Sequence, residues 1–267
     1  MKILFWNTHK NENINTIISE LITDNNISIV VLAEYTADVD ELLQILTMQS
    51  VHMKQYISAG CDRIKIIGSV NQVEPGKQTD QASIQIINND IVMCCVHLNS
   101  QIYSGHQERR EIHIEQIISD IQLLEKELNT DKTIIVGDFN INPYDDTCIN
   151  ARYFHGIPVY EEAKRKTRTV ADKEFSMFYN PMWNFLGDRY QPYGTYYHNG
   201  SDAVNAYWNI YDQVIVRPSI KERFVDESLK ILTETKTIYL LDKNGHPDKN
   251  ISDHLPIMFE IEEDYHG

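Results

Sequence analysis

The sequence predicts an α/β fold in which mixed β-sheets are flanked by helices, such as an α/β sandwich with two stacked sheets. Apolar runs of strand length outnumber the segments with helical periodicity. Several consecutive runs also lie too close together in the chain for a helical crossover, so parts of the sheets are antiparallel. We expect one domain over residues 1–267, because no internal repeat, low-complexity tract or linker interrupts the chain.

The individual elements follow from apolar patterning. Helices are predicted over 13–22, 39–46 and 107–128, where apolar residues recur at helical spacing. Asn88-Asn89-Asp90 joins two strands as a hairpin turn. Residues 144–200 are irregular and rich in aromatic residues. The predicted strands are KILFW, ISIVVLAEY, RIKIIGSV, QASIQIIN, DIVMCCVHLNS, KTIIVGDFN, NIYDQVIVR, TIYLLD and LPIMFEI.

Composition limits the classes of function. The chain has a net charge of −15, which argues against a protein that holds nucleic acid by bulk electrostatics. A nuclease with a local basic rim and a bound metal ion is still compatible with that charge. We expect a cytoplasmic protein, since there is no signal peptide or apolar stretch of membrane-spanning length. No zinc-type spacing occurs, and we expect four reduced, structural cysteines: Cys61, Cys94, Cys95 and Cys148.

Polar residues stand at the ends of several predicted strands. An isolated Asn or Asp at such a place more often caps a turn, and a lone His more often has a structural role. Together, however, the residues form a chemically coherent set: carboxylates for a hard cation, two histidines, and amides that orient oxygen atoms. The set comprises Asn7, Glu34, His97, Asn99, Asp138, Asn140, Asp212, Asp253 and His254. This pattern predicts a Mg²⁺ or Mn²⁺ site that works on phosphate.

Six short motifs in order, FWN, LAE, VHLN, GDFN, YDQV and SDHLP, resemble the endonuclease/exonuclease/phosphatase superfamily. Its members include apurinic endonucleases, pancreatic-type deoxyribonucleases and neutral sphingomyelinases. GDFN and SDHLP are the specific motifs, and the similarity runs from Asn7 to His254. The resemblance implies a four-layered α/β sandwich and metal-dependent hydrolysis of phosphate esters.

The resemblance also implies which residues hold the metal ion. Glu34 corresponds to the principal ligand, and Asn7 supports it from beside the ion. Asp253 lies beside His254 and Asp212 and is a further candidate for the metal shell.

Five residues correspond to the catalytic positions of the superfamily. Asp138 holds or deprotonates the attacking water, and Asn140 orients that water and a phosphate oxygen. His254 contacts the scissile phosphate, with Asp212 fixing its tautomer, and His97 contacts the phosphate or assists the leaving group. The sequence leaves open whether Asp138 or His254 is the general base.

Three departures from the superfamily pattern indicate which of its members this chain resembles most. Ala33 stands where many relatives have Gln before the metal-binding Glu. The motif HLNS fits deoxyribonucleases and sphingomyelinases better than apurinic endonucleases. The cysteine-and-aspartate signature of inositol 5-phosphatases is absent, which argues against that activity.

Two stretches are candidates for substrate binding. Arg109, at the head of the long helix, either pairs with nearby Glu residues or faces the phosphate path. The aromatic segment with Tyr196 and Trp208 either packs an irregular loop or stacks against bases. Asn99 completes the candidate set. The basic run EEAKRKTR is either a solvated face or a grip for a polyanion.

The predicted function is therefore a metal-dependent phosphodiesterase, in the first place a nuclease acting on nucleic acid. The alternative is a phosphatase or phosphodiesterase for a small phosphorylated metabolite or lipid headgroup, which the acidity favours. An inactive scaffold is disfavoured because the catalytic positions are intact. No apolar anchor or basic amphipathic helix points to a membrane partner.

Overall fold

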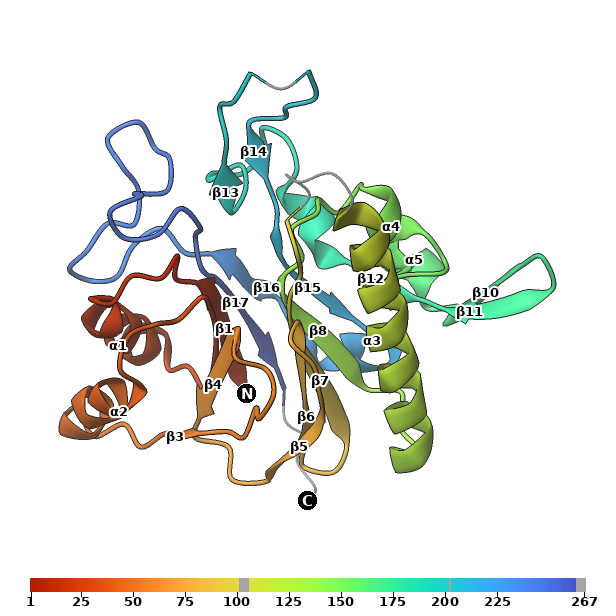
Figure 1. The fold of residues 1–267 in the computed structure, drawn as a ribbon, viewed down its shortest axis with the longest axis horizontal. Helices are drawn as coiled ribbons and strands as arrows, with labels where there is room; N and C mark the ends of the chain where they lie inside the picture. The colour runs from red at the N-terminus through yellow and green to blue at the C-terminus, as the bar shows by residue number, and fades with distance from the viewer. Residues whose placement is uncertain (101–105, 202, 263–267) are drawn as a thin grey trace.

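The computed structural model describes residues 1–100, 106–201 and 203–262. Two mixed sheets pack face to face with helices outside them, which confirms the predicted four-layered α/β sandwich (Figure 1). Helices α1 (Asn15–Asn25) and α2 (Val39–Met48) cover the outer face of one sheet. Helix α3 (His106–Leu128) covers the outer face of the other.

Each sheet combines parallel and antiparallel strands. The first has six strands, in the order β16 (Phe224–Ile231), β17 (Ile257–Ile261), β1 (Lys2–Asn7), β2 (Ile29–Ala33), β4 (Ile64–Gly68) and β3 (Lys54–Gln55). The second has seven, in the order β5 (Val73–Gln78), β6 (Ala82–Ile87), β7 (Ile91–His97), β8 (Thr133–Asp138), β15 (Asp212–Val216), β12 (Phe178–Tyr179) and β9 (Gly156–Ile157). The pairs β1–β2 and β7–β8 are parallel, so the carboxyl ends of these strands meet at one edge of each sheet.

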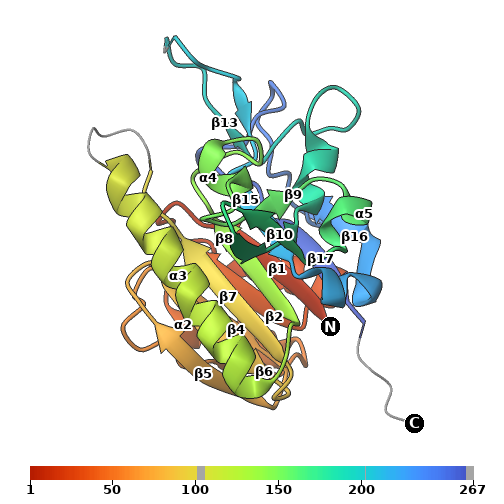
Figure 2. The same cartoon turned by 90° about the vertical axis from the view of Figure 1, so that its right-hand side faces the viewer.

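The two faces of the second sheet belong to different cores because side chains alternate along a strand. Cys95 and Val136 pack in the core between the sheets, whereas Cys94 and Ile135 pack against α3. Figure 2 shows α3 lying along that outer face, across β7 and β8. Cys94 and Cys95 thus point to opposite faces of the sheet, and all four cysteines are buried and unpaired, as predicted.

Local interactions define one terminus of each of the first two helices. The Asp38 carboxylate caps the N-terminus of α2 by accepting hydrogen bonds from the backbone N–H groups of Asp40 and Glu41. Helix α1 ends at Asn26, which takes the left-handed conformation with φ 54°. The three predicted helices are therefore present, with ends shifted by a few residues.

One predicted strand is wrong. TIYLLD forms only isolated bridges, Glu234 with Tyr239 and Leu241 with Pro247, in the long connection between β16 and β17. Its backbone bonds within this connection instead of joining a sheet. Two strands that we did not predict, β5 and β16, lie at sheet edges, where an exposed polar side is tolerated and masks the apolar pattern.

The aromatic segment predicted as irregular contains only short elements. It includes the hairpin β10–β11, which projects from the body of the protein (Figure 1). The elements between β8 and β15, besides β9 and β12, are α4 (Asp146–Ile149), α5 (Tyr160–Ala163), β10 (Thr167–Val170), β11 (Lys173–Ser176), η1 (Pro181–Phe185), β13 (Tyr196–Tyr197) and β14 (Trp208–Asn209). Within the described ranges, no helix is both long and apolar enough to cross a bilayer.

Gly137 in the GDFN motif is required by a close approach between strands. A Cβ atom placed there would lie 1.9 Å from the carbonyl oxygen of Val96, which belongs to the neighbouring strand β7. We expect Gly137→Ala to lower the free energy of unfolding by about 2–4 kcal/mol, since β7 and β8 would have to separate. Urea unfolding measures this, with Gly76→Ala on the edge strand β5 as the control. Equal losses in the two variants would contradict the steric account.

Candidate active site

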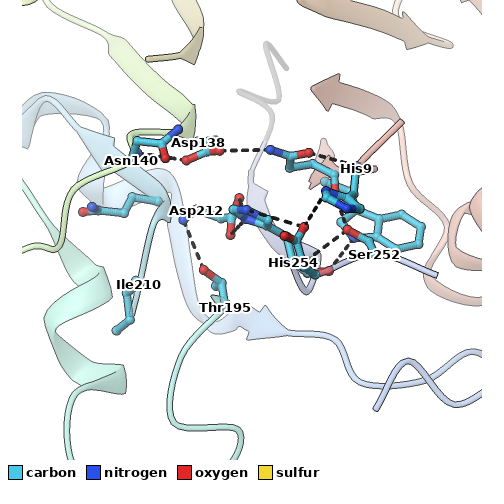
Figure 3. Close-up of polar contacts among 12 residues, drawn as sticks. His9, Asp138, Asn140, Thr195, Ile210, Asp212, Ser252 and His254 are labelled. Atoms are coloured by element: carbon cyan, nitrogen blue, oxygen red, sulfur yellow. Dashed lines mark hydrogen bonds and ion pairs between the residues drawn. The ribbon is translucent and has the colours of Figure 1, made fainter. Parts of the chain in front are cut away.

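Strand register brings three of the predicted residues together. His97 on β7 and Asp212 on β15 are the direct partners of Asp138 on either side of β8. Asn7 ends β1 in the facing sheet, and Glu34 follows the end of β2. The polar strand ends of both sheets therefore meet at one edge of the sandwich, as Figure 3 shows for part of the set.

Asp138 lies at the centre of this group and is 1% exposed. Its Oδ2 accepts a hydrogen bond of 3.0 Å from Nδ2 of Asn7, across the interface between the sheets. Its Oδ1 accepts one of 2.9 Å from the backbone N–H of Asn140. Burial raises the pKa of Asp138 to about 7 and the Asp212 charge adds to this, while His254 and the two hydrogen bonds oppose it. The side chain is thus a buried carboxyl that titrates near neutral pH.

His254 and Asp212 form a buried pair. Nδ1 of His254 lies 2.8 Å from Oδ2 of Asp212, whose residue is fully buried. Burial alone would lower the pKa of His254, but the Asp212 carboxylate outweighs it and raises that pKa to about 10. At neutral pH the imidazole is therefore positively charged and donates from both ring nitrogens.

Three residues that sequence reasoning did not single out hold this pair in place. Trp6 donates from Nε1 to the backbone oxygen of His254 at 2.9 Å. The hydroxyl of Ser252 accepts from the backbone N–H of His254 at 3.1 Å and donates to the backbone oxygen of Asn7 at 2.7 Å. Thr195 Oγ1 accepts from the backbone N–H of Asp212 at 3.2 Å (Figure 3). Trp6 and Ser252 belong to the motifs FWN and SDHLP, so the motif letters were the available signal.

Glu34 points its carboxylate into the same group from a left-handed backbone, with φ 50°. Its backbone N–H donates to the carbonyl of Arg63 at 3.2 Å, and its own carbonyl accepts from Lys10 N–H at 3.1 Å. Its Oε1 lies 3.5 Å from Nε2 of His97, and that nitrogen is 3.8 Å from Oδ2 of Asp138. Burial, followed by the Arg63 charge, lowers the pKa of His97 to about 4, so this imidazole is neutral at pH 7.

The acidic donors of the site suit a hard divalent cation. Ligand atoms of Asp138, Asp212 and His254 lie within 4.8 Å of one another, which is close enough for a shared ion. A charged His254, however, has no lone pair for a metal, because both nitrogens carry protons. Glu34, whose side chain is 26% exposed, instead offers carboxylate oxygen atoms on the side facing His97.

Asp253 stands slightly apart from these donors. Its Oδ1 lies 3.0 Å from Nδ1 of His9 and 4.0 Å from Nε2 of His254. The structure thus places Asp253 beside the charged imidazole, and its pairing with His9 competes with a place in a metal shell.

Of the candidate substrate-binding residues, Tyr196 packs against His254. Its ring centroid lies 4.8 Å from that of His254 and 5.3 Å from that of Tyr211. Trp208 is one layer further out and packs on Tyr197 at 5.3 Å. Asn99 accepts a hydrogen bond from the guanidinium of Arg63, and Arg109 is exposed on α3.

The basic run EEAKRKTR is largely neutralised by neighbouring acids. Lys164 pairs with Glu161, Arg165 pairs with Glu162 at 2.9 Å, and Lys166 pairs with Asp131 at 2.8 Å. Each of these side chains is exposed, so the run is a solvated face, the simpler of the two predictions made for it.

Comparisons with known proteins connect the fold to solved structures. No protein-family model and no curated protein sequence matches the chain. A 3′-5′ exonuclease from Neisseria meningitidis has a TM-score of 0.60 at 18% identity, covering 98% of this chain and 100% of that one. A 3′ phosphatase from Neisseria bound to a product DNA hairpin has a TM-score of 0.58 at 17% identity, with the same coverage. An AP endonuclease from Archaeoglobus fulgidus has a TM-score of 0.56 at 13% identity, covering 98% and 100%. These solved structures share the fold of this chain, so the predicted α/β sandwich is confirmed.

Proposed function

We propose that this chain is a single-domain, cytoplasmic phosphoric ester hydrolase that depends on Mg²⁺ or Mn²⁺ and acts on nucleic acid. The observation that carries the proposal is that two neighbouring buried groups, Asp138 and His254, have separated pKa values. Asp138 titrates near neutral pH, and the neighbouring His254 is held positive by Asp212. Such a separation of pKa values is typical of general acid–base sites. Structural similarity to an exonuclease, a 3′ phosphatase and an AP endonuclease supports the choice of substrate.

Glu34 is the principal residue that would hold the metal ion, with Asn7 beside it and Asp253 as a further candidate. The donors fit the ion because they are hard oxygen atoms and because Glu34 keeps one open side. When bound, the ion supplies Lewis-acid stabilisation of the charge on the phosphate oxygens.

Asp138 is the better candidate for the general base. A base that works near pH 7 needs a pKa close to 7, and burial gives Asp138 such a value. Asn140 supports this role from two directions. Its backbone N–H fixes Oδ1 of Asp138, and its Nδ2 is held by the carbonyl of Leu98 at 2.9 Å. Its amide oxygen thus has a defined direction in which to orient the water.

His254 then acts as a charged hydrogen-bond donor to the phosphate. Asp212 holds Nδ1, which leaves the proton on Nε2 for an oxygen of the substrate. His97 is neutral and lies between Glu34 and Asp138, where it contacts the phosphate or assists the leaving group.

A second candidate is a phosphatase or phosphodiesterase for a small phosphorylated metabolite or lipid headgroup. The observation that favours it is charge. The chain carries −15, and its most basic run is paired with its own acids. A long polyanion would therefore find few cations on this part of the surface.

Hydrolysis with a defined panel tests the proposal. The panel holds single- and double-stranded DNA, RNA, bis-p-nitrophenyl phosphate and phosphomonoesters, each with Mg²⁺, Mn²⁺ or EDTA. We expect metal-dependent cleavage of a polynucleotide, reduced roughly 10²–10⁴-fold in Asp138→Asn and in His254→Ala. The exposed residues His52 and Asp172 provide matched controls as His52→Ala and Asp172→Asn, which keep full activity. Turnover of small esters alone selects the second candidate, and no turnover of any substrate contradicts both.

The raised pKa of Asp138 predicts the pH dependence of that activity. Its base form is lost as pH falls through about 7, so kcat/KM declines about tenfold per pH unit below that value. The charged form of His254 persists up to about pH 10, so the rate stays level from pH 7.5 to 9. A pH–rate profile at saturating metal measures both limbs. A rate that falls between pH 7.5 and 9 would instead assign the titrating group to His254.

Asp212→Asn tests the pair independently of turnover. The folded-state pKa of His254 lies above its ordinary value of 6.5, so the pair stabilises the fold fully below pH 6.5 and progressively less as pH rises through about 10. We expect the variant to lose about 3 kcal/mol of unfolding free energy at pH 6 and clearly less at pH 10.5. Urea unfolding at the two pH values measures the difference. A loss that is independent of pH would contradict a charged imidazole.

A further inference from the structure

Arg63 connects the backbone of the metal-binding loop to a residue at the rim of the site. Its carbonyl oxygen accepts the backbone N–H of Glu34 at 3.2 Å. Its guanidinium Nη1 donates to Oδ1 of Asn99 at 3.0 Å. Asn99 follows two residues after His97, so the guanidinium is held on the side of the site where His97 and Glu34 meet.

The guanidinium is free of acidic partners in the part of the chain that the structure describes. Two other arginines differ in this respect, because Arg217 pairs with Glu125 at 2.8 Å and Arg152 pairs with Glu115 at 2.6 Å. For Arg63 the described side-chain contact is the neutral amide of Asn99. A guanidinium has five N–H donors, so most of those of Arg63 are available to a ligand. In a chain of net charge −15, a half-buried arginine with an amide as its described partner marks a place for an external anion.

The positive charge of Arg63 acts on His97. Among charged residues it is the largest contributor that lowers the pKa of His97, after burial. An anion bound beside His97 would therefore lie within the same field. The oxygen atoms of a substrate phosphate are the anion that the proposed reaction brings there.

We propose that Arg63, oriented by Asn99, binds a phosphate oxygen of the substrate on the His97 side of the metal site. This inference rests on the proposed function and adds a substrate-binding residue to it. The planar guanidinium of Arg63 can donate to two oxygen atoms of one phosphate, and its hydrogen bond to Asn99 fixes the orientation of that plane. The phosphate is either the scissile one or its neighbour in a longer strand.

Arg63→Gln removes the charge, and its effect separates binding from folding. The matched control is Arg168→Gln, which removes an exposed arginine from the projecting hairpin β10–β11 (Figure 1). We expect Arg63→Gln to raise KM and the Kd of inorganic phosphate in the presence of Mn²⁺ roughly 10–100-fold, the range for charge-assisted hydrogen bonds. The value of kcat, the Kd of Mn²⁺ alone and the Tm stay close to those of the unmodified protein. Arg63→Lys, which keeps the charge without the planar guanidinium, gives an intermediate KM.

Two substrates identify which phosphate is bound. A rise in KM for bis-p-nitrophenyl phosphate, which has one phosphate, assigns Arg63 to the scissile group. A rise confined to oligonucleotides assigns it to the neighbouring phosphate. Either result supports phosphate binding by Arg63.

The proposal is overturned if KM and the phosphate Kd of Arg63→Gln stay within twofold of the unmodified values or change equally in Arg168→Gln. Weakened Mn²⁺ binding with unchanged phosphate binding would also overturn it, because Arg63 would then only position Glu34. Absence of all turnover in the unmodified protein counts against the proposed function. The phosphate titrations still decide the role of Arg63 in that case.

Discussion

The hydrogen bond from Asn7 to Asp138 is the constraint on which the site depends, because it joins the two sheets at their polar edge. Asn7 ends a strand of one sheet and Asp138 ends a strand of the other, so the sandwich must close before the two side chains can meet. The bond satisfies one oxygen of a fully enclosed carboxyl, and the backbone of Asn140 satisfies the other. Correct packing of the whole fold is thus a condition for bringing Asn7 and Asp138 together.

That enclosure also sets the chemistry. Burial favours the neutral form of Asp138, while the same low-polarity surroundings strengthen the attraction between His254 and Asp212. The same buried environment therefore raises the pKa of Asp138 toward neutral pH and keeps His254 protonated. The difference arises because His254 has a carboxylate of its own in direct contact, whereas Asp138 receives neutral N–H donors.

The sequence predicted the candidate site well where polar residues follow apolar strands. These polar residues lie side by side in the structure, since parallel strands bring their carboxyl ends together. The sequence was uninformative at edge strands such as β16, whose polar side hides the apolar pattern, and at TIYLLD, whose apolar residues pack in a connection. Arg63 escaped notice because nothing in CDRIK distinguishes it. Its position beside Glu34 results from the antiparallel pairing of β2 and β4, which places Ile64 opposite Ala33.

The acidity of the chain and a phosphate substrate are compatible if the needed positive charge is local. The backbones of Arg63 and Lys10 form hydrogen bonds with the backbone of Glu34 on its two sides, and the charges of both residues act on the neighbouring His97. Phosphate binding then needs no basic surface, and the carboxylates elsewhere repel polyanions that are not engaged at the centre. With so few phosphate contacts, affinity would depend only weakly on salt. The proposed function therefore favours the terminus of a nucleic-acid strand or a single phosphate group as substrate over a long duplex.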